Sequence, residues 1–390
     1  MATRERAKLA FRFVLIVGIV NLFADMTYEG ARAITGPFLG SLGATAAIVG
    51  VVSGAGELLG YGLRSISGHI ADKTHQYWRI ICAGYLINML AVPALALAGN
   101  WPAAAALIVA ERTGRAIRRP SVEAMIAHAG ESVGHGWVFG LNEALDQGGA
   151  TIGPLIAAFV LSRHGSYHRA FAFLLVPAAL CLITLTIARL GYPRPQELSD
   201  RTPEPLQVRG FSRAYWTYAV AGALIAAGFA DFSLIAFHFH KSAVIHQGAI
   251  PVFYAVAMAS GALAALVLGR LLDTVGLPAL LLTFTLSAFA APFVFLGGPS
   301  MALTGVVLWG IGMGVQDSAL KALLARVAPP DRRSTAFGVF DTGFGIAWFL
   351  GSTTMGLLYD HSIVAVALFS TVVQLAALPI LFLARPSETV

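Results

Sequence analysis

The sequence has little charge. Only 12% of its 390 residues are Asp, Glu, Lys or Arg, whereas soluble domains carry about 25% charged residues. Hydrophobic residues make up 57% of the chain, and apolar runs such as 13–20, 103–110 and 170–188 indicate segments that face lipid. A soluble enzyme is therefore excluded. No nucleic-acid partner is expected either, because the net charge of +6 comes from short basic clusters between apolar runs.

Cysteine is nearly absent, and so are the short motifs of soluble enzymes. Cys82 and Cys181 both lie inside apolar runs, which argues against a disulfide framework and a thiolate metal site. The chain has no Gly-x-x-x-x-Gly-Lys-Ser/Thr phosphate loop, no His-Glu-x-x-His and no Gly-x-Ser-x-Gly. We therefore expect no enzymatic activity and no cofactor. If the chain transports a solute, an ion gradient should supply the energy.

Alternating ten-residue strands are also absent, which leaves α-helices as the structure that spans lipid. Each crossing needs about 20 mostly apolar residues. The segments that meet this requirement are 11–39, 45–71, 78–99, 101–119, 136–162, 169–190, 213–239, 249–272, 277–297, 299–327, 334–358 and 362–384. The sequence thus predicts an all-α membrane protein with twelve transmembrane helices.

The basic residues are distributed unevenly between the two ends of these segments. With both termini placed on one side, only Arg163, Arg169 and Lys241 fall near the opposite side. Cytoplasmic loops carry the excess of Lys and Arg, so we expect both termini in the cytoplasm and a multi-pass chain in a bacterial inner membrane. The residues counted as cytoplasmic include Arg112, Arg115, Arg118 and Arg119.

The chain contains an internal repeat. Phe23-Ala24-Asp25 recurs as Phe229-Ala230-Asp231, and the Gly-x-x-x-Asp pattern of 68–72 recurs at 269–273, in the same order and at similar offsets. The proline-rich polar stretch 191–212 separates the two copies and is typical of a linker. We expect two pseudo-symmetric six-helix bundles, 1–190 and 213–390, with a substrate site between them near the middle of the membrane.

These features resemble the major facilitator superfamily along all twelve segments. The most specific match is Gly68-His69-Ile70-Ala71-Asp72-Lys73, which is similar to the family's Gly-x-x-x-Asp-Arg/Lys loop after the second helix. The resemblance implies that Gly68, Asp72 and Lys73 act in gating, because in the family this carboxylate helps to close the cytoplasmic face. The usual Gly-Arg-Arg ending of the motif is missing here.

Two weaker patterns extend the resemblance. Arg112 lies where the family often has an arginine linked to proton coupling, although its neighbours depart from the usual Arg-x-x-x-Gly-x-Gly. Segment 136–162 resembles the family's antiporter motif, which implies export in exchange for protons. The matching positions there are Gly140, Gly149, Gly153 and Pro154. The alternative for this motif is plain helix packing through small residues.

Several ionisable residues fall inside the apolar segments, where each costs roughly 2.5 to 3.5 kcal/mol to insert. Asp25, Glu29 and Arg32 are spaced i, i+4 and i+7, so they share one face of the first segment. We expect Asp25 or Glu29 to carry the coupled proton, with Arg32 as counter-ion or anion contact and Arg112 assisting. The alternative is a permanent Glu29–Arg32 ion pair with no role in transport.

The C-terminal half carries fewer such groups. Asp231, the repeat counterpart of Asp25, is expected to complete a substrate cavity with Asp25, Tyr28 and His238. His238 and His240 point to different faces of a helix, which is poor geometry for a shared metal ion, so no metal site is expected. Glu143 and its counterpart Asp341 lie toward the cytoplasmic side, and we assign them to gating.

The leading hypothesis is a monomeric, proton-coupled exporter of a small organic compound that works by alternating access in the lipid bilayer. Uptake by symport or facilitated transport stays open as an alternative, and so does export of a divalent metal. A receptor or assembly factor that transports nothing is the remaining alternative. It is disfavoured because a scaffold has little reason to bear the insertion cost of so many buried charges.

Overall fold

The computed structural model describes residues 2–74, 76–133, 135–193, 211–274, 277–316, 324 and 333–383. Within these ranges, it describes only the backbone for residues 2–7, 65, 72, 127–133, 135–140, 164, 268–274, 277, 333–335 and 383. The described residues contain helices and no strand, so the predicted all-α class is confirmed.

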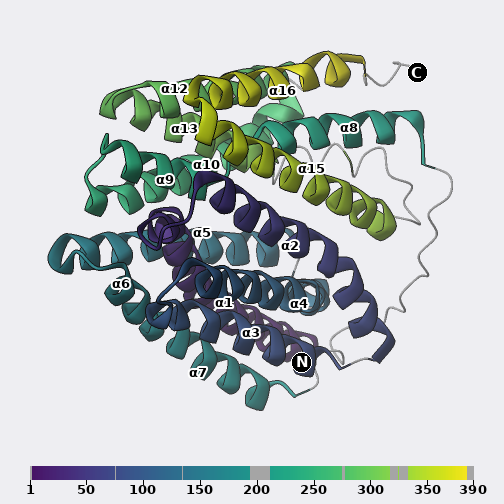
Figure 1. The fold of residues 1–390 in the computed structure, drawn as a ribbon. Helices are drawn as coiled ribbons and strands as arrows, with labels where there is room; N and C mark the ends of the chain where they lie inside the picture. The colour runs from purple at the N-terminus through teal and green to yellow at the C-terminus, as the bar shows by residue number, and fades with distance from the viewer. Residues whose placement is uncertain are drawn as a thin grey trace. The chain divides into compact units, whose positions relative to one another are not determined.

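The helices fall into the twelve expected segments (Figure 1). They are α1 (Ala2–Ser41), α2 (Ala46–Thr74), α3 (Tyr77–Ala94) with η1 (Leu95–Leu97), α4 (Trp101–Val133), α5 (His135–His164), α6 (Tyr167–Phe173), α7 (Leu175–Gly191), α8 (Arg213–Gly228), α9 (Phe232–Ser242), η3 (Gln247–Ala249), α10 (Ile250–Thr274), α11 (Leu277–Ala288), α12 (Ala290–Leu296), α13 (Pro299–Val315), α15 (Arg333–His361) and α16 (Ile363–Leu383). Within the described part of the chain, 9 stretches are long and apolar enough to cross a membrane by length and composition.

Four of the expected segments differ in detail. Prolines explain two interruptions: Pro177 lies just after the junction of α6 and α7, and Pro292 just after that of α11 and α12. A proline has no backbone N–H to donate to the preceding turn, and its ring clashes with the carbonyl group there, so the helix is interrupted. The segment expected to end at 119 continues as α4 to Val133, and the segment expected as one helix over 213–239 is broken between α8 and α9.

The helices form two compact units. Unit 1 comprises Met1–Ile34 and Gly62–Pro203, and unit 2 comprises Thr35–Tyr61 and Glu204–Val390. The C-terminal end of α1 and the first half of α2 thus belong to unit 2. Residues 194–210, most of the expected linker, lie outside the described residues, and the division into 1–190 and 213–390 stays a prediction.

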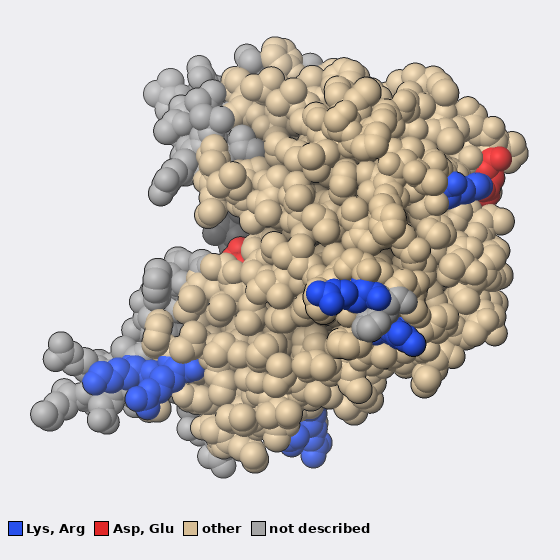
Figure 2. All heavy atoms as spheres, turned by 90° about the vertical axis from the view of Figure 1, so that its left-hand side faces the viewer, with Lys and Arg blue, Asp and Glu red and all other residues tan. Residues whose placement is uncertain are grey.

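The surface is rich in large apolar side chains. Leu97 is 87% exposed and Leu190 is 77% exposed, and many other Leu, Ile, Val and Phe side chains lie open. The face shown in Figure 2 carries few charged residues. Such a surface is unsuited to water and suits a lipid environment.

In unit 1, α3 and α4 approach closely at Gly84 and Gly114. A Cβ on Gly84 would lie 2.7 Å from the Gly114 carbonyl oxygen, and one on Gly114 would lie 2.6 Å from the backbone nitrogen of Asn88. Any larger side chain would push the two helices apart. This close crossing places Asn88 of α3 beside the polar face of α4.

In unit 2, the break between α8 and α9 leaves backbone carbonyls that the helices cannot satisfy. The Trp309 indole N–H donates to the Ala230 carbonyl at 2.7 Å. Ser370 and Gln374 of α16 donate to the Gly228 carbonyl at 2.6 Å and 3.0 Å. Buried polar backbone without water needs such partners, and three side chains supply them here.

In unit 2, the C-terminal end of α1 and the N-terminal half of α2 pack against helices from the C-terminal half of the sequence. A Cβ on Gly36 would overlap the carbonyl oxygen of Ser233 in α9, and one on Gly50 would overlap that of Ser352 in α15. At the start of α2, the Asp360 carboxylate accepts from the backbone N–H groups of Ala46 at 3.3 Å and Ala47 at 3.1 Å. A carboxylate at a helix N-terminus is favourable.

Candidate functional site

The charged face of α1 is buried inside unit 1. Asp25, Tyr28, Glu29 and Arg32 are between 5% and 8% exposed. α1 is continuous through this region, so the predicted i, i+4 and i+7 spacing holds and places the four side chains on successive turns of one face. The three charged residues assigned from the sequence to proton coupling on α1 therefore lie together.

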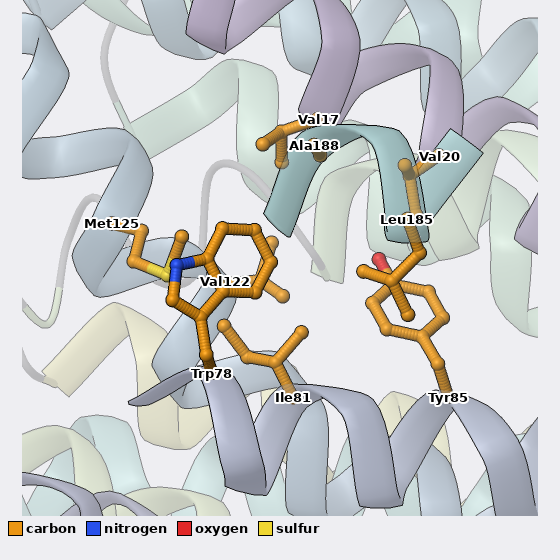
Figure 3. A pocket seen from close by; sticks show the side chains of 9 residues that line it. All are labelled: Val17, Val20, Trp78, Ile81, Tyr85, Val122, Met125, Leu185 and Ala188. Atoms are coloured by element: carbon orange, nitrogen blue, oxygen red, sulfur yellow. The ribbon is translucent and has the colours of Figure 1, made fainter. Parts of the chain in front are cut away.

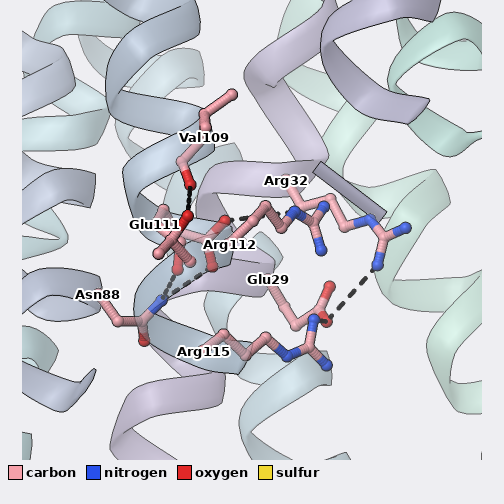
Figure 4. Close-up of polar contacts among 8 residues, drawn as sticks. Glu29, Arg32, Asn88, Val109, Glu111, Arg112 and Arg115 are labelled. Carbon is pink, nitrogen blue, oxygen red and sulfur yellow. Dashed lines mark hydrogen bonds and ion pairs between the residues drawn. The ribbon is translucent and has the colours of Figure 1, made fainter. Parts of the chain in front are cut away.

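α4 faces them with a row of charges (Figure 4). Arg112 Nε lies 3.3 Å from Glu111 Oε2, and the Asn88 side chain of α3 donates to Glu111 Oε1 at 2.8 Å. Glu29 Oε1 lies 3.8 Å from Arg115 Nη1 and 4.0 Å from Arg32 Nη1. Glu111 thus holds Arg112 closely, while Glu29 is shared at longer distance between two guanidinium groups.

Two arginines of α4 stack on tyrosine rings. The Arg115 guanidinium carbon lies 4.3 Å from the centre of the Tyr28 ring. That of Arg118 lies 4.2 Å from the centre of the Tyr85 ring and 5.9 Å from that of Tyr28. A guanidinium over an aromatic face gains cation–π attraction without using its edge N–H donors. Tyr28 also hydrogen-bonds to Asp25, which feels the charges of both arginines.

A hydrogen-bonded chain connects this region to α5. Tyr85 donates to Asn21 Oδ1, Asn21 donates to Asn142 at 2.9 Å, and Asn142 donates to Asp146 at 3.1 Å. The Arg118 guanidinium makes a long contact of 3.5 Å to Asn21. The chain extends the polar region from the stacked arginines to a second carboxylate on α5.

The glycines of the helix-five motif pack against α1 at the turn that carries Asp25. A Cβ on Gly149 would overlap the Leu22 carbonyl oxygen and lie 2.9 Å from Asp25 Cβ. One on Gly153 would overlap the Met26 carbonyl oxygen. Pro154 lies inside α5 directly after this contact. Gly140 belongs to the stretch of α5 for which only the backbone is described.

The C-terminal residues assigned to the substrate cavity have partners within unit 2. Asp231 caps the N-terminus of α9 by accepting from the Ser233 N–H at 2.8 Å. His238 is 3% exposed and lies 2.9 Å from the Tyr359 hydroxyl, with Phe295 against its ring. In the described part of the chain, no three His, Cys, Asp or Glu side chains gather as they would around a metal ion.

The residues assigned to gating lie on α2, α5 and α15. A Cβ on Gly68 would meet Pro120 of α4 at 3.4 Å, and Lys73 is exposed. The side chain of Asp72 lies outside the described residues. Glu143 is exposed on α5 and accepts from Gln147 at 2.9 Å, and Asp341 is half-buried on α15.

An apolar pocket within unit 1 is unsuited to a polar substrate (Figure 3). Its cavity volume of about 10 Å³ holds roughly one water molecule. The lining side chains are Val17, Val20, Trp78, Ile81, Tyr85, Val122, Met125, Leu185 and Ala188. Packing of α1, α3, α4 and α7 accounts for this space better than ligand binding does.

Sequence reasoning missed the role of Arg115 and Arg118. The positive-charge count treated both, with Arg112, as cytoplasmic residues, whereas Arg112 is 7% and Arg118 is 5% exposed inside α4. Their spacing at 112, 115 and 118 places them along one side of a helix, and this periodicity was the available signal.

Comparison with known proteins gives a consistent result. The model of the Major Facilitator Superfamily matches residues 17–352 and 248–389. An uncharacterized protein of Mycobacterium tuberculosis is 38% identical over 390 residues, which cover 98% of this chain and 95% of the relative. The fosmidomycin resistance protein of Escherichia coli is 23% identical, over 93% of this chain and 89% of that protein.

Solved structures with the same fold include a variant of the nucleoside transporter NupG, with a TM-score of 0.74 and 12% identity over 94% of this chain and 99% of the other. The peptide transporter POT in complex with sulfate also has a TM-score of 0.74, with 15% identity over 96% of this chain and 93% of the other. At these identities, the similarity establishes the fold alone.

Proposed function

Because this chain belongs to the Major Facilitator Superfamily, we propose that it couples the export of a small organic compound to the movement of protons. Family membership makes it a multi-pass membrane transporter and not an enzyme. The proton, the direction and the chemical nature of the compound are the parts that we propose.

The single observation that supports proton coupling is the environment of Asp25. Its carboxyl group is buried, hydrogen-bonds to Tyr28 and lies beside Arg115 and Arg118. No guanidinium among the described residues lies within ion-pair distance of it, whereas Glu29 is shared by two arginines. We assign Asp25 to proton binding and Glu29 to holding Arg32 and Arg115. A buried carboxyl between these groups can exchange a proton when the surrounding helices change arrangement.

Two observations support export. Gly149 and Gly153 bring α5 into contact with α1 at Asp25, so a movement of α5 would be felt at the proposed proton site. In addition, one relative is named for resistance to fosmidomycin. Resistance to a compound favours its removal from the cell.

Uptake by proton symport is the second candidate, and the arginines beside Asp25 favour it. A proton on Asp25 leaves Arg115 and Arg118 with more uncompensated positive charge, which attracts an anion. In a symporter, the proton and the substrate bind together, whereas in an exchanger they exclude each other. Linkage between the two therefore separates the candidates.

Alternating access requires contacts that can open. We propose that the contacts of Gly36 with Ser233, of Gly50 with Ser352 and of Asp360 with the start of α2 separate on the non-cytoplasmic side during the cycle. Gly68, Asp72 and Lys73, with Glu143 and Asp341, are proposed to act on the cytoplasmic side. Small residues allow close contact without locking side chains into each other.

The proposal is tested with protein in liposomes. Compounds that raise the melting temperature of the purified protein are loaded, and their movement is followed under an imposed pH gradient. We expect accumulation opposite to the proton flow. Asp25→Asn should abolish the gradient-driven part while compound exchange across the membrane continues, and Asp231→Asn serves as the control at the repeat-equivalent position.

Two results would count against parts of this proposal. An unchanged pH dependence in Asp25→Asn would remove Asp25 as the proton site. Movement of the compound together with the protons would rule out export by exchange and support symport.

A further inference from the structure

Positive charge exceeds negative charge in the buried cluster between α1 and α4. Glu111 pairs with Arg112, and Glu29 is shared between Arg32 and Arg115. Arg118 has no carboxylate within ion-pair distance among the described residues, although it is only 5% exposed. A buried ionised group without a counter-charge is costly. Arg118 is therefore the arginine of this cluster that a further anion would stabilise most.

Arg118 is also short of hydrogen-bond acceptors. Its Nε atom is buried and has no partner among the described residues, and its one side-chain hydrogen bond there is the 3.5 Å contact to Asn21. Stacking on Tyr85 and Tyr28 fixes the plane of the guanidinium and leaves its edge donors unused. A guanidinium held in this way presents a planar fork that matches an oxyanion.

Arg115 adds a second donor group on the same side of α4. It stacks on Tyr28 at 4.3 Å, and its acidic partner Glu29 is 3.8 Å away and is shared with Arg32. The Arg115 side chain is 17% exposed, more than that of Arg32 or Arg112. Arg115 is thus the most exposed arginine of this cluster.

We propose that Arg115 and Arg118 bind the anionic group of a small organic substrate, a carboxylate, phosphonate or sulfonate, with Tyr28 holding both guanidinium groups in place. The inference rests on the proposed transport function in either direction, because it concerns what the site recognises. The anion supplies the counter-charge that Arg118 lacks and accepts hydrogen bonds from both forks.

The proposal links anion binding to Asp25. The charged and titratable groups that act on Asp25 are Tyr28 and Glu29 from α1, Tyr85 from α3, Arg115 and Arg118 from α4, Asp146 from α5 and Cys181 from α7. An ionised Asp25 competes with the substrate anion for the field of the two arginines. A proton on Asp25 removes that competition, and anion binding that strengthens at low pH would support the symport candidate.

The test measures binding of probe anions to the purified full chain by isothermal calorimetry and by melting temperature. Benzenesulfonate, phenylphosphonate and benzoate are compared with benzylammonium and benzyl alcohol, which share the ring and lack the negative charge. We expect the three anions to bind and the other two to bind at least about tenfold more weakly, since charge-assisted hydrogen bonds supply the difference.

Variants locate the site. Arg118→Gln and Arg115→Gln should each weaken benzenesulfonate binding by at least about tenfold, and Arg118→Lys should weaken it less because the charge is kept. Arg119→Gln is the matched control, since Arg119 is the next residue, is 36% exposed and pairs with Glu123 at 2.9 Å. Elution on gel filtration identifies any variant that fails to fold, and Arg118→Lys then carries the test.

The pH series uses benzenesulfonate, which stays ionised throughout. Binding that strengthens as the pH falls, and that no longer changes with pH in Asp25→Asn, supports the symport candidate, whereas binding that weakens as the pH falls supports exchange. Equal binding of benzylammonium, or anion binding that survives Arg115→Gln and Arg118→Gln together, would overturn the proposal, as would the failure of all three anions to bind.

The outcomes for this site and for the proposed function are distinct. Anions that bind through Arg115 and Arg118 but do not move across liposomes under any gradient leave the site standing and refute coupled transport. Gradient-driven transport of a cation or a neutral compound, with no binding of the probe anions, supports coupled transport and refutes the anion site.

Discussion

The interiors of the two units differ in the side chains that they bury. Unit 1 encloses a cluster of ionised groups, with Glu29, Arg32, Glu111 and Arg112 all less than 9% exposed. Unit 2 encloses aromatic rings, in which Phe229, Phe232, Tyr254, Trp309 and Trp348 form ring contacts with one another. Among the described residues, buried charged side chains are thus more numerous in unit 1 than in unit 2.

The pair Asp25 and Asp231 illustrates this difference. Both follow the same Phe-Ala dipeptide, yet Asp25 lies within the continuous helix α1 beside arginines, and Asp231 caps the half-helix α9. The Asp231 carboxylate accepts a backbone N–H and so stabilises the start of its own helix. Equal sequence in a repeat therefore does not imply equal chemistry.

The largest effect should come from breaking the charged interior. Glu111→Leu removes the partner of Arg112 and of Asn88, and we expect the free energy of unfolding in detergent to fall by about 3 to 5 kcal/mol, because a buried guanidinium loses its counter-charge. Titration with denaturing detergent measures it. Glu123→Gln, which breaks the exposed pair with Arg119, should cost about 1 kcal/mol or less. Similar decreases in the free energy of unfolding for both variants would show that the buried pair stabilises the protein no more than the exposed pair does.

An intermediate effect should come from the aromatic interior of unit 2. Trp309→Phe leaves the Ala230 carbonyl at the α8–α9 break without its donor, at a cost of about 1 to 3 kcal/mol beyond the lost ring area. Trp348→Phe is the matched control, because the Trp348 indole N–H is buried and has no hydrogen-bond partner among the described residues. The difference between the melting temperatures of the two variants isolates the hydrogen bond. No difference would mean that the break is held by packing alone.

The smallest effect should come from the cap of α9. Asp231→Ala is expected to cost about 1 kcal/mol of stability, and Asp231→Ser should recover most of it because serine also caps helices. Transport by both variants should keep the pH dependence of the unaltered protein, which is measured in liposomes. A shift in that dependence would give Asp231 a share of the coupling and remove the contrast with Asp25.

Much of the fold could be predicted because lipid imposes a simple rule on length and hydropathy. The twelve segments follow from it, whereas the family resemblance rests on the repeat and on the motif at 68–73; both are confirmed. The break between α8 and α9 could not be predicted from hydropathy, since Gly228, Phe229 and Ala230 do not stand out from their apolar neighbours. The carbonyls of Gly228 and Ala230 are satisfied by Trp309, Ser370 and Gln374 from distant segments.

The candidate site was accessible from the sequence on α1 and largely hidden on α4. Helical spacing alone is enough to put Asp25, Glu29 and Arg32 on one face of α1. Arg118 was counted with the cytoplasmic basic residues because the apolar segment was expected to end at 119, whereas α4 continues to Val133. The stacking on Tyr28 and Tyr85 depends on how α1, α3 and α4 cross, which no single helix pattern contains.

The contact between the end of α1 and α9 has a consequence for how the protein is made. Gly36 is synthesised roughly 200 residues before Ser233, the residue it touches, so this contact is strongly non-local. The faces of α1 and α2 that carry Gly36 and Gly50 therefore lack their partners until α9 and α15 have been synthesised. In a chain truncated before α9, the face of α1 around Gly36 would lack this partner.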